Sequence, residues 1–127
     1  MEKTLLSIVE MGGYANFSKL YSSKGYAVES VNSMRKAIKF LQKNCPEIIV
    51  AEFNFQSDFR DRTSSLESLM AAVQGMSDTK VIVFYEQEQR KQLDRLLAVF
   101  HVYETIAFPV NEQILSTTLD RVLQEVA

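Results

Sequence analysis

The chain has 127 residues, enough for one ordinary domain and too few for a two-domain enzyme. Its 14 basic and 16 acidic side chains give a net charge of −2, which argues against a basic surface for nucleic acid. One cysteine excludes an internal disulfide, and one histidine leaves too few ligands for a His/Cys metal site. We therefore expect a single domain over residues 1–127, without metal, cofactor or thiol–imidazole catalysis.

Neither end of the chain carries a recognisable targeting signal or membrane anchor. The apolar run over residues 5–9 is far shorter than the roughly 18 residues that a membrane span needs. We therefore expect a cytoplasmic protein that does not bind membranes.

Apolar segments of strand length alternate along the chain with segments of helical period. The first strand is predicted over residues 4–9 and the second over 26–31. A helix is predicted between them over 14–24, and Gly25 stands where a left-handed cap would end it. The apolar face of this helix consists of Phe17, Leu20 and Tyr21.

The third strand, over 48–53, is apolar almost throughout, which favours a strand covered on both faces. Cys45, just before it, is expected to be a small buried side chain. Ser64 and Glu67 form a capping box that opens the third helix. The helices on either side of this strand have apolar residues at the i, i+3, i+4, i+7 spacing, namely Met34, Ala37, Ile38 and Leu41, then Leu66, Leu69, Met70 and Val73.

The fourth strand is predicted over 81–85 and the fifth over 103–108, and Asn111 is placed to cap the last helix. Strict alternation of strands and helices implies an open three-layer α/β fold, in which helices cover both faces of a five-stranded parallel sheet. The first, third and fourth strands are the most apolar, so we expect them at its centre. The last two helices have apolar faces made of Leu93, Leu96, Leu97 and Phe100, then Ile114, Leu115, Leu119 and Val122.

The element order and local sequence resemble a response-regulator receiver domain over essentially the whole chain. The resemblance lies in LLSIVE at the first strand, GYAVESVNSMRKAIKFLQKNCPEIIVAEFNF through the second and third, KVIVFY at the fourth and IAFPVNEQIL at the fifth. It implies a flavodoxin-like fold with the strand order 2-1-3-4-5, and ligands in such sheets bind beyond the carboxyl ends of the strands.

The family's phosphorylation site is altered at its acidic positions. The acidic pair after the first strand falls on Glu10 and Met11, and the phosphoacceptor aspartate falls on Glu52. Met11 replaces a hard oxygen ligand by a soft thioether, which suits magnesium poorly. Glu52 keeps a carboxylate but extends it by about 1.5 Å, enough to spoil in-line attack on a phosphoryl group.

The remaining positions of this site are altered as well. The Ser/Thr after the fourth strand falls on Tyr85, the lysine before a proline on Phe108, and the aromatic switch residue on Thr105. Phe108 removes the cation that stabilises the transferred group. Only Pro109 keeps the identity found in the family, and its peptide bond with Phe108 can be cis, as in receivers. The chain thus resembles a degenerate receiver, or pseudo-receiver.

Glu10 and Glu52 follow neighbouring strands and would repel each other by about 3 kcal/mol at a separation of about 6 Å. Three arrangements relieve this repulsion: a bound cation, a shared proton, or one carboxylate turned to solvent or to a nearby Arg or Tyr hydroxyl. Gly12 and Gly13 follow the first strand without a phosphate-loop motif, so we interpret them as a tight turn.

Two surfaces are candidates for binding another protein. The segment 96–103 has more apolar residues than one buried face requires, and an interaction face is predicted at Val99, Val102, Tyr103 and Thr105. The long connection over 53–63 is a candidate partner-binding lid, whose residues are Phe55, Phe59, Arg60 and Arg62.

We therefore predict a non-catalytic pseudo-receiver that acts as a protein-interaction module in signalling, with another signalling protein or a second copy of the chain as partner. Two alternatives stay open. Glu52 could mimic the phosphorylated state of an atypical receiver, or the strand ends could bind a small ligand as in flavodoxin-like proteins. The second alternative lacks a Ser/Thr-rich phosphate loop after the first strand.

Overall fold

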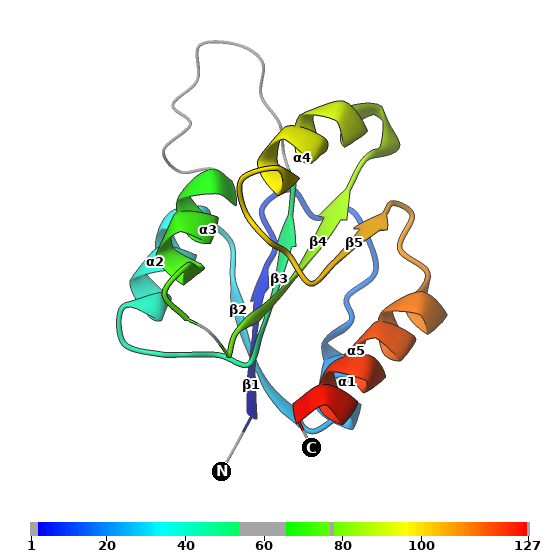
Figure 1. Ribbon diagram of the computed structural model, residues 1–127. Helices are drawn as coiled ribbons and strands as arrows, with labels where there is room; N and C mark the ends of the chain where they lie inside the picture. Colours follow the sequence, from blue (N-terminus) through cyan, green and yellow to red (C-terminus); the bar gives the residue numbers. More distant parts are fainter. Residues whose placement is uncertain (1–2, 54–65, 77, 127) are drawn as a thin grey trace.

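The computed structural model describes residues 3–53, 66–76 and 78–126. Five strands form one sheet in the order β2-β1-β3-β4-β5, and every neighbouring pair is parallel (Figure 1). This order confirms the prediction, with the two less apolar strands at the edges. The strands are β1 (Lys3–Ile8), β2 (Tyr26–Val31), β3 (Ile48–Glu52), β4 (Lys80–Tyr85) and β5 (Glu104–Ala107).

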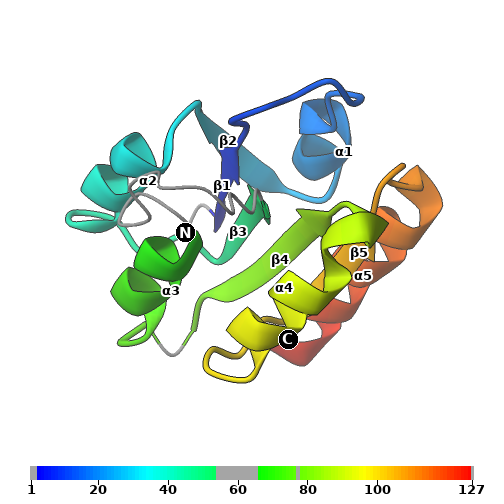
Figure 2. The ribbon, with the colours of Figure 1, turned by 90° about the horizontal axis from the view of Figure 1, so that it is seen from above.

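Helices cover both faces of the sheet, as predicted. One core receives side chains from α2 (Met34–Leu41), α3 (Leu66–Val73) and α4 (Arg90–Leu97), and the other from α1 (Ser18–Ser23) and α5 (Glu112–Val126). A short 3-10 turn, η1 (Gln87–Gln89), leads into α4. Figure 2 shows α2 and α3 on one side of the sheet and α1 and α5 on the other.

Successive residues of the central strands enter two different cores, which explains why these strands are apolar throughout. In β4, Val83 and Tyr85 pack in the core on the α2–α4 side, whereas Phe84 packs in the core on the α1/α5 side. In β3, Val50 also belongs to the α1/α5 core. Glu52 lies two residues further along the same strand and in register with Phe84, so its side chain starts from the α1/α5 face.

The segment between β1 and β2 differs from the prediction. A helix was expected over 14–24, but α1 begins at Ser18, where the Asn16 side-chain oxygen accepts the Ser18 N–H at 2.8 Å. The residues before it run as an irregular loop: Gly12 and Gly13 have φ of +69° and +80°, and Tyr14 is held by its hydrogen bond to Glu52. The expected end of the helix is confirmed: Gly25 has φ of +94°.

Two further local predictions have different outcomes. Cys45 is exposed rather than buried, because it lies in the connection between α2 and β3 and not in either core. Asn111 does cap α5: its side-chain oxygen accepts the N–H groups of Gln113 and Ile114 at 2.8 and 3.1 Å. The capping box at Ser64 and the candidate lid residues Phe55, Phe59, Arg60 and Arg62 lie outside the described residues.

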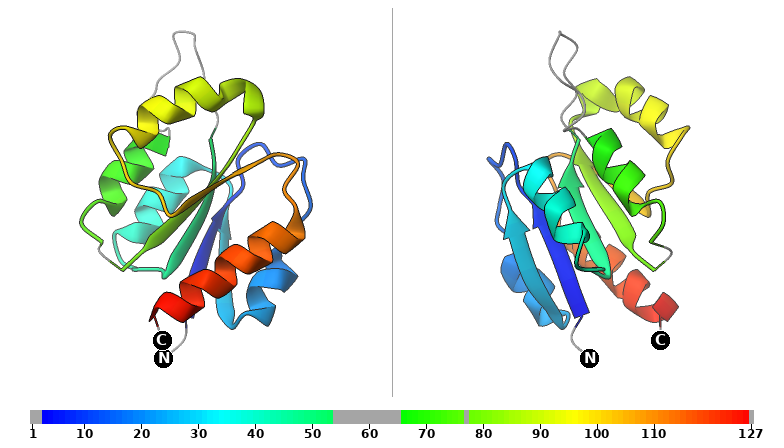
Figure 3. Two further views of the ribbon diagram at one scale, coloured as in Figure 1. Left: turned by 45° about the vertical axis from the view of Figure 1, so that its right-hand side comes forward. Right: turned by 90° about the vertical axis from the view of Figure 1, so that its left-hand side faces the viewer.

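The carboxyl ends of the strands meet at one edge of the sheet. The β1–α1 connection and the β5–α5 connection come together at this edge, above α1 and α5 (Figure 3). This edge is where the site residues were predicted.

Candidate functional site

The structure places the predicted site residues at the carboxyl edge of the sheet, but in two environments. Glu52, 2% exposed, ends β3 on the α1/α5 side. Phe108 and Pro109 follow β5 and are joined by a cis peptide bond. Tyr85 ends β4 and packs in the core on the other face, so it does not share the environment of Glu52.

The Glu52 carboxylate is held by the loop between β1 and α1. One of its oxygens, Oε1, accepts the Met11 N–H at 2.8 Å. The other, Oε2, accepts the Tyr14 hydroxyl at 2.6 Å and the Gly12 N–H at 3.3 Å. The buried carboxylate therefore has hydrogen-bond donors at both oxygens, as a buried charge requires.

The two glycines allow the loop to direct backbone N–H groups at the Glu52 carboxylate. Positive φ at Gly12 and Gly13 turns the chain so that successive N–H groups, those of Met11 and Gly12, point at one carboxylate. Such a run of N–H groups forms a concave anion-binding nest. In this chain the anion in the nest is the protein's own Glu52.

Tyr14 completes this arrangement. Its pKa is raised, first by burial and then by its hydrogen bond and charge interaction with Glu52. Ionising the phenol would bury a second negative charge beside the carboxylate, so Tyr14 stays protonated and its hydroxyl donates a hydrogen bond to Glu52. Nothing in the sequence pattern marked Tyr14 for this role beyond its position next to a double glycine.

The two glutamates that were expected to repel each other are separated by their environments. Glu10 is exposed, whereas Glu52 is buried and accepts the Tyr14 hydroxyl. Of the three arrangements considered, the contact between Glu52 and a Tyr hydroxyl is the one that the structure contains.

An aromatic cluster surrounds Tyr14. The Tyr14 and Phe108 ring centroids are 5.2 Å apart, and those of Tyr14 and Phe84 are 5.7 Å apart. Phe17 stacks on Tyr14 at 6.4 Å, and Phe84 and Phe108 meet edge to face at 5.9 Å. Phe108 is thus a packing residue. Its ring contacts Tyr14, so that the β5–α5 connection packs against the β1–α1 loop.

No protein-family model matches the sequence, and no match was found among curated proteins. Many solved structures match the fold. A signal receiver domain of an HD domain-containing protein from Pseudomonas fluorescens Pf-5 aligns over 97% of this chain and 96% of its own, with a TM-score of 0.75 and 13% identity. A response regulator from Desulfuromonas acetoxidans aligns over 100% of both chains, with a TM-score of 0.73 and 20% identity. The chemotaxis response regulator CheY4 of Vibrio cholerae aligns over 100% of both chains, with a TM-score of 0.66 and 19% identity.

The chain has the receiver fold. Identities of 13–20% to these structures establish the architecture and not the chemistry of the strand ends.

The residues at the strand ends of this receiver fold do not fit a magnesium ion. Magnesium needs several oxygen lone pairs directed at one point. Here both Glu52 oxygens accept N–H or O–H donors, and Met11, a thioether, is 74% exposed. Across residues 3–53, 66–76 and 78–126, no group of three or more His, Cys, Asp or Glu side chains could hold a metal ion.

On the opposite face of the sheet, Tyr85 is linked to β5 through Arg90. The Arg90 guanidinium lies 5.2 Å from the centre of the Tyr85 ring and donates to the Thr105 hydroxyl at 3.3 Å. Asp94, one turn further along α4, holds the same guanidinium at 2.9 Å. A hydrogen bond with Tyr85 is the largest cause that raises the pKa of Arg90. Thr105 is half-buried, and its hydroxyl accepts this hydrogen bond from Arg90.

The predicted interaction face is partly exposed. Val99, just beyond α4, is 70% exposed, whereas Val102 and Tyr103 are half-buried. The Tyr103 hydroxyl donates to Glu125, and the Arg121 guanidinium lies 5.4 Å from the centre of the Tyr103 ring. Val99 is thus the side chain of this face that protrudes most clearly.

No helix among the described residues has the length and apolar character to cross a membrane.

Proposed function

We propose that the protein is a non-catalytic pseudo-receiver that serves as a protein-interaction module in signal transduction. The observation that carries this proposal is the loop around Glu52: the residue at the phosphoacceptor position is buried, with a donor at each oxygen. A carboxylate in this state is a structural anchor rather than a nucleophile.

The cost of freeing the carboxylate supports this proposal. Attack on a phosphoryl group needs an oxygen with an open, in-line approach. Freeing Oε2 requires Tyr14 and Gly12 to release it, and neither Met11 nor Phe108 supplies the metal ligand or the cation that the transfer needs. The same contacts weaken the alternative in which Glu52 mimics a phosphorylated residue, because its donors come from the β1–α1 loop and not from Tyr85 or Phe108.

A titration with magnesium and beryllofluoride, an analogue of the phosphoryl group, tests whether this pocket is silent. We expect no amide NMR shift at Gly12, Gly13 or Phe53, and no added phosphoryl mass after incubation with acetyl phosphate and magnesium. A saturable shift at these amides that needs both reagents, or a phosphoryl adduct that is lost in Glu52→Gln, would refute the proposal.

We infer that the interaction face binds a second copy of the chain, in the cytoplasm. Val99 supports this because a 70% exposed valine at the edge of a half-buried apolar segment loses water contact on association. Light scattering over a concentration series should detect a dimer that Val99→Ser weakens. Met11→Ser is the matched control, since Met11 is 74% exposed but lies at the carboxyl edge of the sheet. A protein that stays monomeric at high concentration contradicts the dimer.

A further inference from the structure

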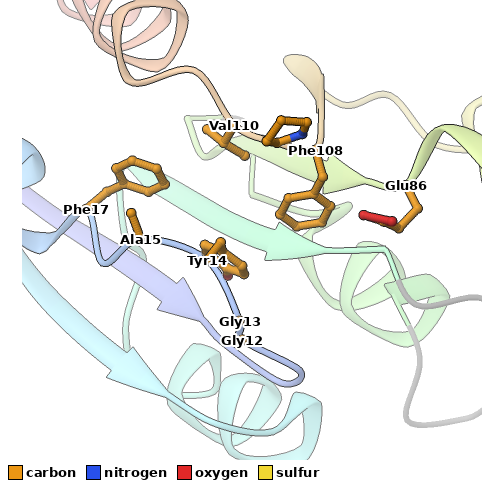
Figure 4. A pocket seen from close by; sticks show the side chains of 9 residues that line it. Gly12, Gly13, Tyr14, Ala15, Phe17, Glu86, Phe108 and Val110 are labelled. Atoms are coloured by element: carbon orange, nitrogen blue, oxygen red, sulfur yellow. The ribbon is translucent and has the colours of Figure 1, made fainter.

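A cavity of about 570 Å³ lies at the carboxyl edge of the sheet, between the β1–α1 loop and the start of the β5–α5 connection. Its volume falls in the range of sites for small molecules, and its place is where open α/β sheets bind ligands. Glu52 does not line it, but its carboxylate accepts the hydroxyl of the lining residue Tyr14. The cavity is lined by Gly12, Gly13, Tyr14, Ala15, Phe17, Glu86, Phe108, Pro109 and Val110 (Figure 4).

Three of the nine lining residues are aromatic, namely Tyr14, Phe17 and Phe108. Tyr14 and Phe108 are half-buried, with their ring centres 5.2 Å apart, and Phe17 stacks on Tyr14 at 6.4 Å. The faces of such rings carry partial negative charge, which attracts cations. The hydrogen bond from Tyr14 to the Glu52 carboxylate strengthens this effect, because it draws the phenol proton away and makes the ring more electron-rich.

The charged group of the lining is an acid. Figure 4 shows the Glu86 side chain at the rim, with its carboxylate directed toward Phe108. None of the nine described residues that line the cavity is basic. A carboxylate at the rim, and a second one hydrogen-bonded to the Tyr14 hydroxyl, would repel a phosphate or carboxylate ligand and attract a cation.

We propose that this cavity binds a small organic cation, namely an ammonium group that carries methyl or methylene substituents. The substituents contact Tyr14, Phe17 and Phe108, and the charge lies over the rings and toward Glu86. The proposal does not depend on phosphoryl chemistry or on self-association, so it can fail independently of the function proposed above. It also gives the flavodoxin-like alternative a defined ligand class that excludes nucleotide phosphates.

A pair of probes with the same shape separates charge from apolar burial. Choline is the cation, and 3,3-dimethylbutan-1-ol is its neutral counterpart, in which carbon replaces nitrogen. We expect choline to produce saturable NMR shifts in the ring protons of Tyr14, Phe17 and Phe108, with the alcohol binding at least about threefold more weakly. Equal affinity for the two probes, or absence of saturation by choline up to high millimolar concentration, would overturn the proposal.

Variants test the two kinds of contact separately. Glu86→Gln keeps the size of the side chain but removes its charge, and should weaken choline binding about threefold, as expected for an exposed ion pair. Glu88→Gln is the control, because Glu88 is exposed in the neighbouring turn and does not line the cavity. Phe108→Leu should weaken choline binding while leaving the affinity for the alcohol nearly unchanged. If Glu86→Gln and Glu88→Gln bind choline equally, the acidic rim has no role and the proposal fails.

Discussion

At the scale of single residues, the main feature of this protein is that Glu52 serves as an internal ligand for its own β1–α1 loop. A buried carboxylate is costly unless each oxygen has donors, and Met11, Gly12 and Tyr14 supply them here. Glu52 stands where the resemblance to receivers places an aspartate, and its side chain, longer by one methylene, ends among these donors.

Glu52→Gln should destabilise the fold. The amide replaces one acceptor oxygen by a donor that faces an N–H or O–H group, which costs about 2 kcal/mol of unfolding free energy. Urea unfolding followed by circular dichroism measures the change. Glu88→Gln, at an exposed position, should change stability by less than about 0.5 kcal/mol. An equal effect of the two substitutions would mean that the loop does not depend on the Glu52 charge.

The raised pKa of Tyr14 predicts that the stability of the fold depends on pH in the alkaline range. Its pKa lies above the ordinary value of 10.0 in the folded state, because burial and Glu52 disfavour the phenolate. The folded state therefore holds this proton more tightly than the unfolded state, and its contribution to stability is fully present below pH 10.0 and falls as pH rises above it. Tyr14→Phe should be less stable at neutral pH by about 1 kcal/mol.

Urea unfolding at a series of alkaline pH values checks this prediction. The stability of Tyr14→Phe should fall less steeply above pH 10.0 than that of the wild type. Tyr21, whose pKa is also raised by burial, is retained in both proteins and accounts for part of the common slope. Parallel curves for the two proteins would contradict the role given to Tyr14.

At the scale of elements, the β1–α1 connection decides the character of the site. It runs as a loop through Gly12 and Gly13 and becomes helical at Ser18. The loop lies over the end of β3, and its aromatic residues pack against Phe84 and Phe108. The β1–α1 connection therefore supplies the hydrogen bonds to the Glu52 carboxylate and also forms one wall of the neighbouring cavity.

Gly12→Ala should weaken this loop. Gly12 has φ of +69°, and an added methyl group would meet the Val9 side chain at an ordinary contact distance of 3.6 Å. The cost therefore comes from the backbone conformation and is about 1 to 2 kcal/mol, measured by urea unfolding. Gly75→Ala is the matched control, because Gly75 lacks positive φ and an added methyl group there meets no atom within 4 Å. Equal losses in the two variants would show that the loop conformation is not what Gly12 provides.

At the scale of the whole molecule, one sheet separates two cores that have different helices. Leu69 of α3 and Leu119 of α5 are both fully buried, one in each core. The sheet is shared by the two cores, so we expect residues 1–127 to unfold as a single domain.

Leu69→Ala and Leu119→Ala test this expectation. Each should cost about 3 kcal/mol of unfolding free energy, because a cavity replaces a buried leucine. In each variant, unfolding followed by near-ultraviolet and far-ultraviolet circular dichroism should show one coincident transition. Ile114→Ala, at a side chain that is 54% exposed, is the control with a small effect. Two separate transitions would mean that the cores unfold independently.

Sequence periodicity predicted the architecture correctly, because a strand that is buried on both faces has apolar residues throughout its length. Alternate residues of β4, such as Val83 and Phe84, enter opposite cores, so the whole strand reads as apolar. Caps at Gly25 and Asn111 are equally local and were predicted correctly. The start of α1 was predicted too early, since contacts of Tyr14 with distant residues override the helical spacing of its neighbours.

The sequence by itself determined the receiver fold and the residue types at the strand ends, because both depend on local order along the chain. Only the tertiary structure decided what Glu52 does. Its partners Met11 and Tyr14 lie 41 and 38 positions away, and the direction of a carboxylate depends on which donors the fold brings to it. The same holds for Phe108 and Glu86, which the fold places with Tyr14 around one cavity.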